Sequence, residues 1–334
     1  MKGPARTIRK LTPWLQLAAE IGFLLQRLNS TPAEAPSQSA SRNQLPAPAK
    51  LDVVQPRFSF LFLLAWGIPA VGQPAPGMND DLTTAQGQAL VESSLANELH
   101  AAQDESHLMR YRLRKTSPRL TTTKEIYETK DGAVARLISI NDKPLSQADE
   151  QQEEARLNEL LGDPGKQRRR KQSENADAAR ALKVLGVLPN AFEYQYTGSG
   201  DGPTGKVEKF TFRPNPNFSP PDLETQALTA IVGEIWIDPA RQRVARLEGH
   251  LQQGVDFGWG MLGHLNKGGW IVIEQADVGG GRWRTIRFQM AMSGRVVFKS
   301  KTFDTMEDQT EFAPLPAGLD YRTAIHMLLD DRTP

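Results

Sequence analysis

The sequence predicts a mainly antiparallel β fold with helices, an α+β protein built as a curved sheet or half-open barrel with a helical plug and a helical insertion. Two observations support this prediction. Short stretches of alternating apolar and polar residues recur between residues 82 and 330, separated by turn residues such as Gly, Asp and Pro. Helix-like stretches at 84–103, 148–161 and 167–185 interrupt them. We expect a single β-rich domain over residues 82–330.

The chain before residue 82 is predicted to lie outside this domain. Residues 1–56 are interpreted as a disordered or mis-annotated leader, because 31–50 are rich in Pro, Ala, Ser and Gln. Residues 57–72 are predicted to be a signal peptide, with basic Arg57 ahead of a short apolar run that ends in small residues. Residues 73–81 would then be a linker.

Two alternatives remain for the apolar run at 58–71. It is a buried core segment, or it is an uncleaved anchor behind a cytoplasmic extension. Because signal peptides begin chains, the signal interpretation places the natural start near residues 51–54 and cleavage before Gln73. Sequencing of the N-terminus from the native envelope tests this expectation, and a mature chain that begins at Met1 would contradict it.

Composition narrows the possible functions. The chain contains no cysteine, which excludes disulfides, thiolate metal sites, a cysteine nucleophile and a lipid anchor on cysteine. Beyond residue 72 it carries 32 Lys and Arg against 36 Asp and Glu. This mildly acidic balance does not favour nucleic-acid binding, which needs a basic surface to neutralise phosphates.

The first part of the domain is predicted to be a helix followed by three strands. Thr83 or Thr84 can cap a helix over 84–103, and alternation from Met109 to Leu113 predicts a strand. Two more strands are expected at 124–130 and 133–141. Asp131-Gly132 between them is typical of a two-residue hairpin turn.

A helical insertion is predicted over residues 147–186. Ser146 precedes a first helix at 148–161, and a second helix from 167 to 185 is expected to stop at Gly186 and Pro189. Residues 167–175 contain almost no apolar side chain, so we expect them to be solvent-exposed or mobile. The basic run at 168–171 is interpreted as a solvated helix face, not as a lipid or nucleic-acid patch.

The remainder is predicted to be β structure with a closing helix at 321–329. Strands are expected around 192–196 and 210–212, at 231–237 and 244–251, and at 255–259, 270–276, 283–292 and 295–303. Asp238-Pro239, residues 277–281 and Ser293-Gly294 are interpreted as the turns of three of these hairpins.

No motif for catalysis or for a cofactor is found, so neither is predicted. Residues 258–263 match a dinucleotide-binding fingerprint, but a strand is expected after them where that site needs a helix. No two of the five histidines have metal-ligand spacing, and there is no G-x-S-x-G elbow or P-loop. We therefore expect a protein that is not an enzyme and holds no metal.

Aromatic and apolar side chains are concentrated in the C-terminal strands. We predict that they line an apolar ligand cavity on a curved sheet, although such residues also form ordinary cores. The candidate ligand-binding residues are Trp236, Phe257, Trp259, Leu262, Trp270 and Phe288.

The order of these segments, with Trp236-Ile237-Asp238-Pro239 closing a hairpin, resembles outer-membrane lipoprotein-sorting and lipoprotein-carrier proteins. It also resembles uncharacterised bacterial envelope proteins that carry segments like residues 212–216 and 257–265. The long helical insertion departs from the compact carriers. The resemblance implies a half-open barrel, plugged by helices, that shelters acyl chains.

We accordingly expect an exported protein of the periplasm or outer envelope that binds lipid or lipoprotein acyl chains, with possible peripheral envelope association. The alternative is a non-catalytic envelope scaffold or interaction protein with a filled core. A hydrolase is a more distant alternative. The sequence does not predict the oligomeric state.

Overall fold

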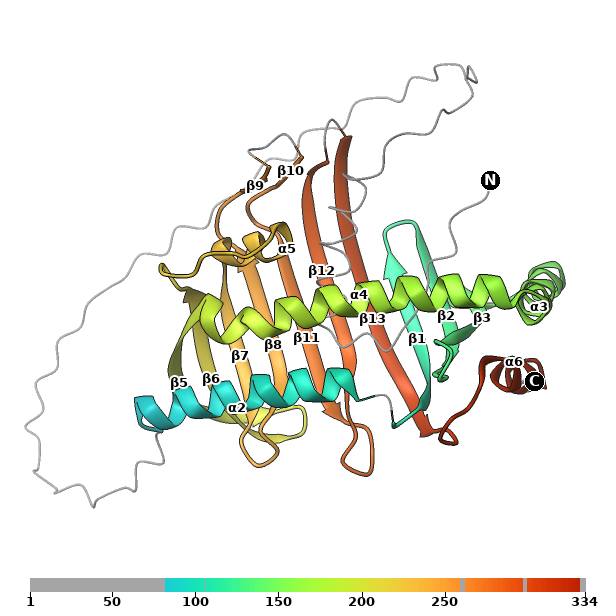
Figure 1. The fold of residues 1–334 in the computed structure, drawn as a ribbon, viewed down its shortest axis with the longest axis horizontal. Helices are drawn as coiled ribbons and strands as arrows, with labels where there is room; N and C mark the ends of the chain where they lie inside the picture. The colour runs from blue at the N-terminus through green and yellow to red at the C-terminus, as the bar shows by residue number, and fades with distance from the viewer. Residues whose placement is uncertain (1–81, 105, 259–261, 297–298, 331–334) are drawn as a thin grey trace, which may run out of the picture. The chain divides into compact units, whose positions relative to one another are not determined.

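The computed structural model describes residues 82–104, 106–258, 262–296 and 299–330. The predictions for the leader, the signal peptide and the linker lie outside these residues. The described strands form one antiparallel sheet of 13 strands (Figure 1), which is open because its two edge strands, β4 and β5, do not pair with each other. The predicted fold class is therefore confirmed.

The path across the sheet is β4-β3-β2-β1-β13-β12-β11-β8-β7-β6-β5, with β10 paired to β12 and β9 paired to β10. The strands are β1 (Met109–Ser117), β2 (Leu120–Tyr127), β3 (Val134–Ile140), β4 (Lys143–Pro144), β5 (Phe192–Gly202), β6 (Gly205–Pro214), β7 (Ile231–Asp238), β8 (Arg243–Leu251), β9 (Val255–Phe257), β10 (Gly263–Leu265), β11 (Trp270–Asp277), β12 (Trp283–Val296) and β13 (Lys299–Pro314). The helices are α2 (Thr84–Gln103), α3 (Gln147–Gly162), α4 (Pro164–Ala191), α5 (Leu223–Gln226), the short 3-10 helix η1 (Ala227–Ala230) and α6 (Tyr321–Asp330).

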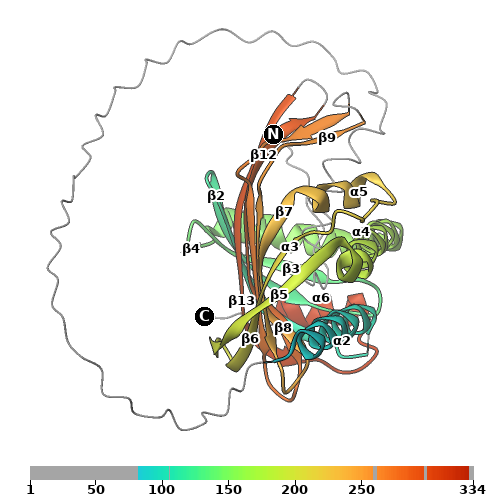
Figure 2. The same ribbon diagram turned by 90° about the vertical axis from the view of Figure 1, so that its left-hand side faces the viewer.

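Helices α2, α4 and α5 lie on one side of the sheet (Figure 2). Helix α2 begins as predicted, because the Thr83 side chain accepts a hydrogen bond from the backbone of Gln86 at 3.3 Å. Its buried residues Val91 and Leu95 belong to the main apolar cluster. Among the described helices, none is long and apolar enough to cross a membrane.

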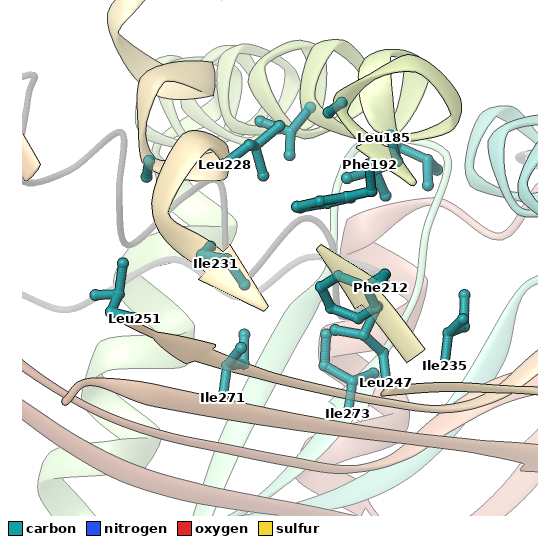
Figure 3. Packing of buried hydrophobic residues seen from close by; sticks show 14 of the residues in the cluster. Leu185, Phe192, Phe212, Leu228, Ile231, Ile235, Leu247, Leu251, Ile271 and Ile273 are labelled. Carbon is teal, nitrogen blue, oxygen red and sulfur yellow. The ribbon is translucent and has the colours of Figure 1, made fainter. Parts of the chain in front are cut away.

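The main apolar cluster fills the space between these helices and the sheet. Figure 3 shows Leu185 and Leu228 on the helical side, facing strand residues such as Phe212 and Ile273. A second cluster forms where α3 and α6 meet strand β3, and it includes Val134, Leu157 and Ile325. The sheet therefore has two separate apolar contacts with its helices.

The opposite face of the sheet carries charges in register. Residues that are direct cross-strand partners on β6, β7, β8, β11, β12, β13 and β1 are, in order, Lys209, Trp236, Arg246, Glu274, Arg287, Asp308 and Arg114. The Lys209 ammonium lies 4.1 Å from the centroid of the Trp236 ring, and Arg287 donates to Asp308 at 2.8 Å. Opposite charges on facing strands stabilise the sheet, so this row suits a face in contact with water.

Helix α4 differs from the prediction in two ways. It continues past Pro189 to Ala191, and hydrogen bonds from Asn215 satisfy the carbonyls of Asn190 and Ala191 at 2.9 Å each. Its first half is also docked, since Gln167 is 2% exposed and Glu174 is 1% exposed. The predicted exposure of 167–175 is therefore wrong for Gln167 and Glu174, whereas five residues of the stretch are exposed as expected, namely Arg168, Arg169, Gln172, Ser173 and Asn175.

The docking contacts explain this error. Gln167 donates to the carbonyl of Asp131 at 2.8 Å, Arg170 donates to that of Ala133 at 3.2 Å, and Lys171 donates to that of Lys130. Long polar side chains thus satisfy a loop whose backbone groups would otherwise need water. A search for apolar periodicity does not detect this kind of contact.

Two predicted turns are also wrong. Residues 128–133 connect β2 and β3, so Asp131-Gly132 is part of a longer loop and not a two-residue turn. Ser293-Gly294 lies inside β12, where Gly294 pairs with Lys301. A Cβ at Gly294 would lie 2.3 Å from the carbonyl oxygen of His264 on β10. This glycine is needed because another strand approaches the backbone closely.

Candidate functional site

A cavity of about 280 Å³ lies between α4, the end of α2 and the 128–133 loop. Ala102 and Ala178 line it and also pack against the main apolar cluster, whereas Leu108 belongs to the second cluster. The cavity therefore lies where the two apolar clusters approach each other. We call it the α4 cavity.

Two buried carboxylates form part of the wall of the α4 cavity. Glu128 is 3% exposed and accepts a hydrogen bond from the backbone of Met109 at 2.9 Å. Glu174, on α4, approaches the loop so closely that a Cβ at Gly132 would lie 2.8 Å from its Oε2 atom. Burial raises the pKa of the neighbouring Tyr111 well above its ordinary value, and both carboxylates add to this shift.

Basic side chains lie nearer to solvent. Lys130 is exposed, and Lys171 is partly buried and donates to the carbonyl of Lys130. Asp104, also in the lining, accepts hydrogen bonds from the hydroxyl of Ser106 at 2.6 Å and from Nδ1 of His107 at 2.8 Å. These contacts, with the backbone N–H of Ser106, hold the pKa of Asp104 well below its usual range. Asp104 is thus ionised at neutral pH.

A smaller cavity of about 40 Å³ adjoins the first and shares Ala102, Asp104 and Glu128 with it. Its other walls include Tyr111, Gln275, Thr285 and Gln309. Thr285 is 4% exposed, and its hydroxyl makes no hydrogen bond to any described residue. A buried hydroxyl without a partner is unusual in a folded protein, and this one borders a space large enough for a water molecule.

A buried ion pair holds α2 against strands β8 and β11, whose residues line the smaller cavity. Glu98 is 1% exposed and accepts hydrogen bonds from Arg243 at 2.8 and 3.1 Å, from the backbone of Val244 at 3.1 Å and from Gln275 at 3.2 Å. Since Arg243 and Gln275 also line the smaller cavity, the hydrogen bonds of Glu98 join helix α2 to the wall of that cavity. It therefore sets the position of the Ala101–Ala102 wall.

The structure does not bring the six predicted ligand-binding residues to one surface. Phe257, Phe288 and the partly buried Leu262 belong to the main apolar cluster. Trp236 and Trp270 lie on the opposite face, because they alternate along their strands with residues of that cluster. Trp259 lies outside the described residues. The five predicted ligand-binding residues that the structure describes therefore do not line one common cavity.

The α4 cavity was not predicted from the sequence. Glu174 and Lys171 occur in a very polar helix whose docking the sequence did not indicate. Thr285 and Gln275 face each other on β12 and β11 at inward positions. A polar residue at an inward strand position is a signal that alternation can detect, and it would have found Gln275, two positions after the inward Ile273. Thr285 points inward only because a register shift between Glu274 and Gln275 changes the phase of β12, which alternation does not reveal.

No protein-family model matches the chain, and no sequence match is found among curated proteins. Among solved structures, the chain is similar to a domain from Vibrio parahaemolyticus described as an outer membrane lipoprotein-sorting protein. This match has 10% identity and a TM-score of 0.29, and covers 72% of this chain and 98% of that one. MucB, solved in complex with MucA(peri), matches with 11% identity and a TM-score of 0.21, covering 67% of this chain and 99% of that one. Both similarities are weak and neither assigns a function to this chain.

Proposed function

We propose that this is an exported, non-catalytic envelope protein that binds one end of an amphiphilic ligand, a lipid or the lipid-modified part of a lipoprotein, in the α4 cavity. The observation that carries this proposal is the composition of the cavity wall. Ala102 and Ala178 in this wall also pack against the main apolar cluster, and the wall carries the basic Lys130 and Lys171 together with the acidic residues Asp104, Glu128 and Glu174. An amphiphile has the same division between an apolar part and a polar part.

The size of the cavity agrees with partial enclosure of the ligand. A volume of about 280 Å³ lies just below the range of roughly 300–1,000 Å³ typical of small-molecule pockets. The cavity therefore suits one end of a larger molecule. Each buried methylene would contribute about 0.8 kcal/mol, so several methylenes beside Ala102 and Ala178 are needed before binding overcomes the entropic cost of association.

The second candidate is an envelope scaffold or interaction protein. The main apolar cluster favours it, since Phe210 and Phe288 are each 1% exposed and Ile235 is fully buried. Those side chains occupy the region where the sequence suggested an acyl-chain cavity. In that case the α4 cavity would be a packing feature without a ligand.

A pair of adjacent substitutions on α4 tests the proposal. Ala178→Leu places a larger side chain in the cavity, whereas Ala179→Leu adds the same side chain at an exposed position of the same helix. Binding of a lysophospholipid, measured by isothermal titration calorimetry, should weaken at least tenfold in the first variant and stay unchanged in the second. Absence of binding to the wild-type protein, or equal binding by both variants, would favour the scaffold.

A further inference from the structure

We infer that Lys124 is the centre of an anion site, formed by residues of β1, β2, α3 and α4, that binds a phosphate group. The ligand class is a phosphate monoester, either free in solution or at the head of a lipid. None of the residues of this site lines the α4 cavity, so the inference does not depend on the proposed function.

The strand register places two lysines beside each other. Lys115 on β1 pairs with Thr122 on β2, and Lys124 follows on the same face of β2 two positions later. On its other side Lys115 pairs with Glu307 of β13, which in turn pairs with Phe288 of the main apolar cluster. The two lysines therefore lie on the face of the sheet that the helices cover.

The helices add two guanidinium groups next to β2. Arg156 on α3 donates to the carbonyl of Ala135 on β3 at 2.6 Å. Arg170 on α4 donates to the carbonyl of Ala133, just before β3, at 3.2 Å. Burial lowers the pKa of Arg170, and the attraction of Glu174 offsets this only in part. Because β3 pairs with β2, both guanidinium groups are anchored beside the lysines.

Two carboxylates in this region are already matched by other cations. Glu153 on α3 is 8% exposed and accepts hydrogen bonds from Arg156 at 2.6 and 2.7 Å. It also accepts from the backbone of Leu137 at 2.8 Å. Glu307 is 5% exposed and accepts from Lys115 at 2.5 Å. Each of these carboxylates thus has a cation of its own.

Lys124 has no such partner. Its side chain is partly buried, and its ammonium group makes no hydrogen bond or ion pair with a residue that the structure describes. Burial lowers the pKa of Lys124, and so do three neighbouring cations, Arg156, Lys115 and Arg170. Glu153 acts in the opposite direction but does not cancel them. An anion next to Lys124 would relieve this repulsion, because charges away from bulk water are poorly screened.

The donors around Lys124 suit phosphate. Ammonium groups at 115 and 124, the hydroxyl of Thr122 and the guanidinium of Arg170 come from three different elements. They can therefore approach a tetrahedral anion from several directions, and guanidinium and ammonium groups are the usual partners of phosphate oxygens. A phosphate monoester carries a charge of about −1.5 to −2 at pH 7, which matches more than one of these cations.

The experiment compares two phosphate monoesters that share a polar end. Glycerol 3-phosphate and lysophosphatidic acid, below its micelle concentration, are titrated calorimetrically into the full-length protein at constant ionic strength. Lys124→Met should weaken binding by about tenfold or more. Lys206→Met, at an exposed position of β6 near the far edge of the sheet, should bind as the wild type does.

The two sources of phosphate are distinguished in the Ala178→Leu variant, in which the α4 cavity is filled. Equal affinity of that variant for the two compounds indicates a water-soluble phosphate ligand, and tighter binding of lysophosphatidic acid indicates a lipid headgroup. Loss of lysophospholipid binding in the α4 cavity with glycerol 3-phosphate binding retained would leave this inference standing without the proposed function.

Two results overturn the inference. One is the absence of binding of both compounds to the wild-type protein, and the other is undiminished binding by Lys124→Met. That variant is expected to fold, because Lys124 has no hydrogen-bond partner to lose among the described residues. If circular dichroism shows that it does not fold, acetylation of the wild type with acetic anhydride decides the question. Glycerol 3-phosphate should then protect Lys124 and leave Lys206 unprotected, as measured by mass spectrometry, and equal modification of Lys124 with and without it overturns the inference.

Discussion

Replacing Glu98 by alanine should strongly destabilise the protein, because this side chain connects α2 to two strands of the sheet. Its carboxylate is 1% exposed and accepts four hydrogen bonds, from two nitrogens of Arg243, from Val244 and from Gln275. Removal leaves the guanidinium of Arg243, whose side chain is 17% exposed, without its partner. The donors of Val244 and Gln275 lose the same acceptor.

The expected magnitude follows from this geometry. Breaking a buried ion pair by deleting one partner costs about 3–5 kcal/mol. The lower end applies here because part of Arg243 reaches solvent, so we expect the free energy of unfolding to fall by about 3 kcal/mol. For a domain of this size, that lowers Tm by about 6–12 °C.

Urea unfolding followed by far-ultraviolet circular dichroism measures this change. The matched control is Glu92→Ala, since Glu92 lies on the same helix but is exposed, and its carboxylate accepts a hydrogen bond from the nearby exposed Gln88 at 2.9 Å. The control should change stability by no more than about 0.5 kcal/mol. A loss of less than about 1 kcal/mol for Glu98→Ala would show that the pair does not hold α2 on the sheet.

Three further outcomes are expected. Gly132→Ala should destabilise the fold by about 1–2 kcal/mol, since Gly132 has φ of 97° and an added Cβ would lie 2.8 Å from Oε2 of Glu174. Gly186→Ala, in a helix with open space around it, should stabilise the fold by about 0.5–1 kcal/mol, and thermal unfolding of the two variants distinguishes these signs. The double variant Arg170→Ala/Lys171→Ala loses two hydrogen bonds to the 128–133 loop. Trypsin should cleave it at the adjacent exposed arginines faster than it cleaves the wild type, and equal rates would show that these bonds do not dock the helix. Hydrogen bonds, mainly from Ser106, depress the pKa of Asp104 in the folded protein, so the stability that this carboxylate contributes is present at neutral pH and is lost as the pH falls below about 4. Asp104→Asn should therefore make the urea midpoint depend less on acid pH, and an unchanged dependence would contradict this.

Local chemistry was enough to predict several elements. The capping residue Thr83 and the apolar spacing of α2 predicted that helix at 84–103, as observed. The hairpin of β7 and β8 follows from alternation on both sides of Asp238-Pro239. In each case, the information lies in a few neighbouring residues, because capping and alternation depend on the backbone within one turn or one strand.

The site required contacts between distant segments. Trp236 and Trp270 are both aromatic residues in strands, but the strand partners decide that they lie away from the main apolar cluster. Glu174 lies in a polar helix, and only its approach to Gly132, 42 positions earlier in the numbering, makes it a cavity wall. Neither result follows from local pattern.

The sequence by itself therefore determined the fold class, the first and last helices of the domain and most of the strands, because hydrophobic periodicity, capping and turn preference act locally. Only the tertiary structure decided where α4 docks, why Gly294 lies within a strand and which charged residues meet in the α4 cavity. The docking of α4 and the cavity wall depend on polar side chains that meet backbone or charged groups far away along the chain, and the place of Gly294 depends on the close approach of β10. Such pairing leaves no periodic signal, since each contact is specific to one place in the folded protein.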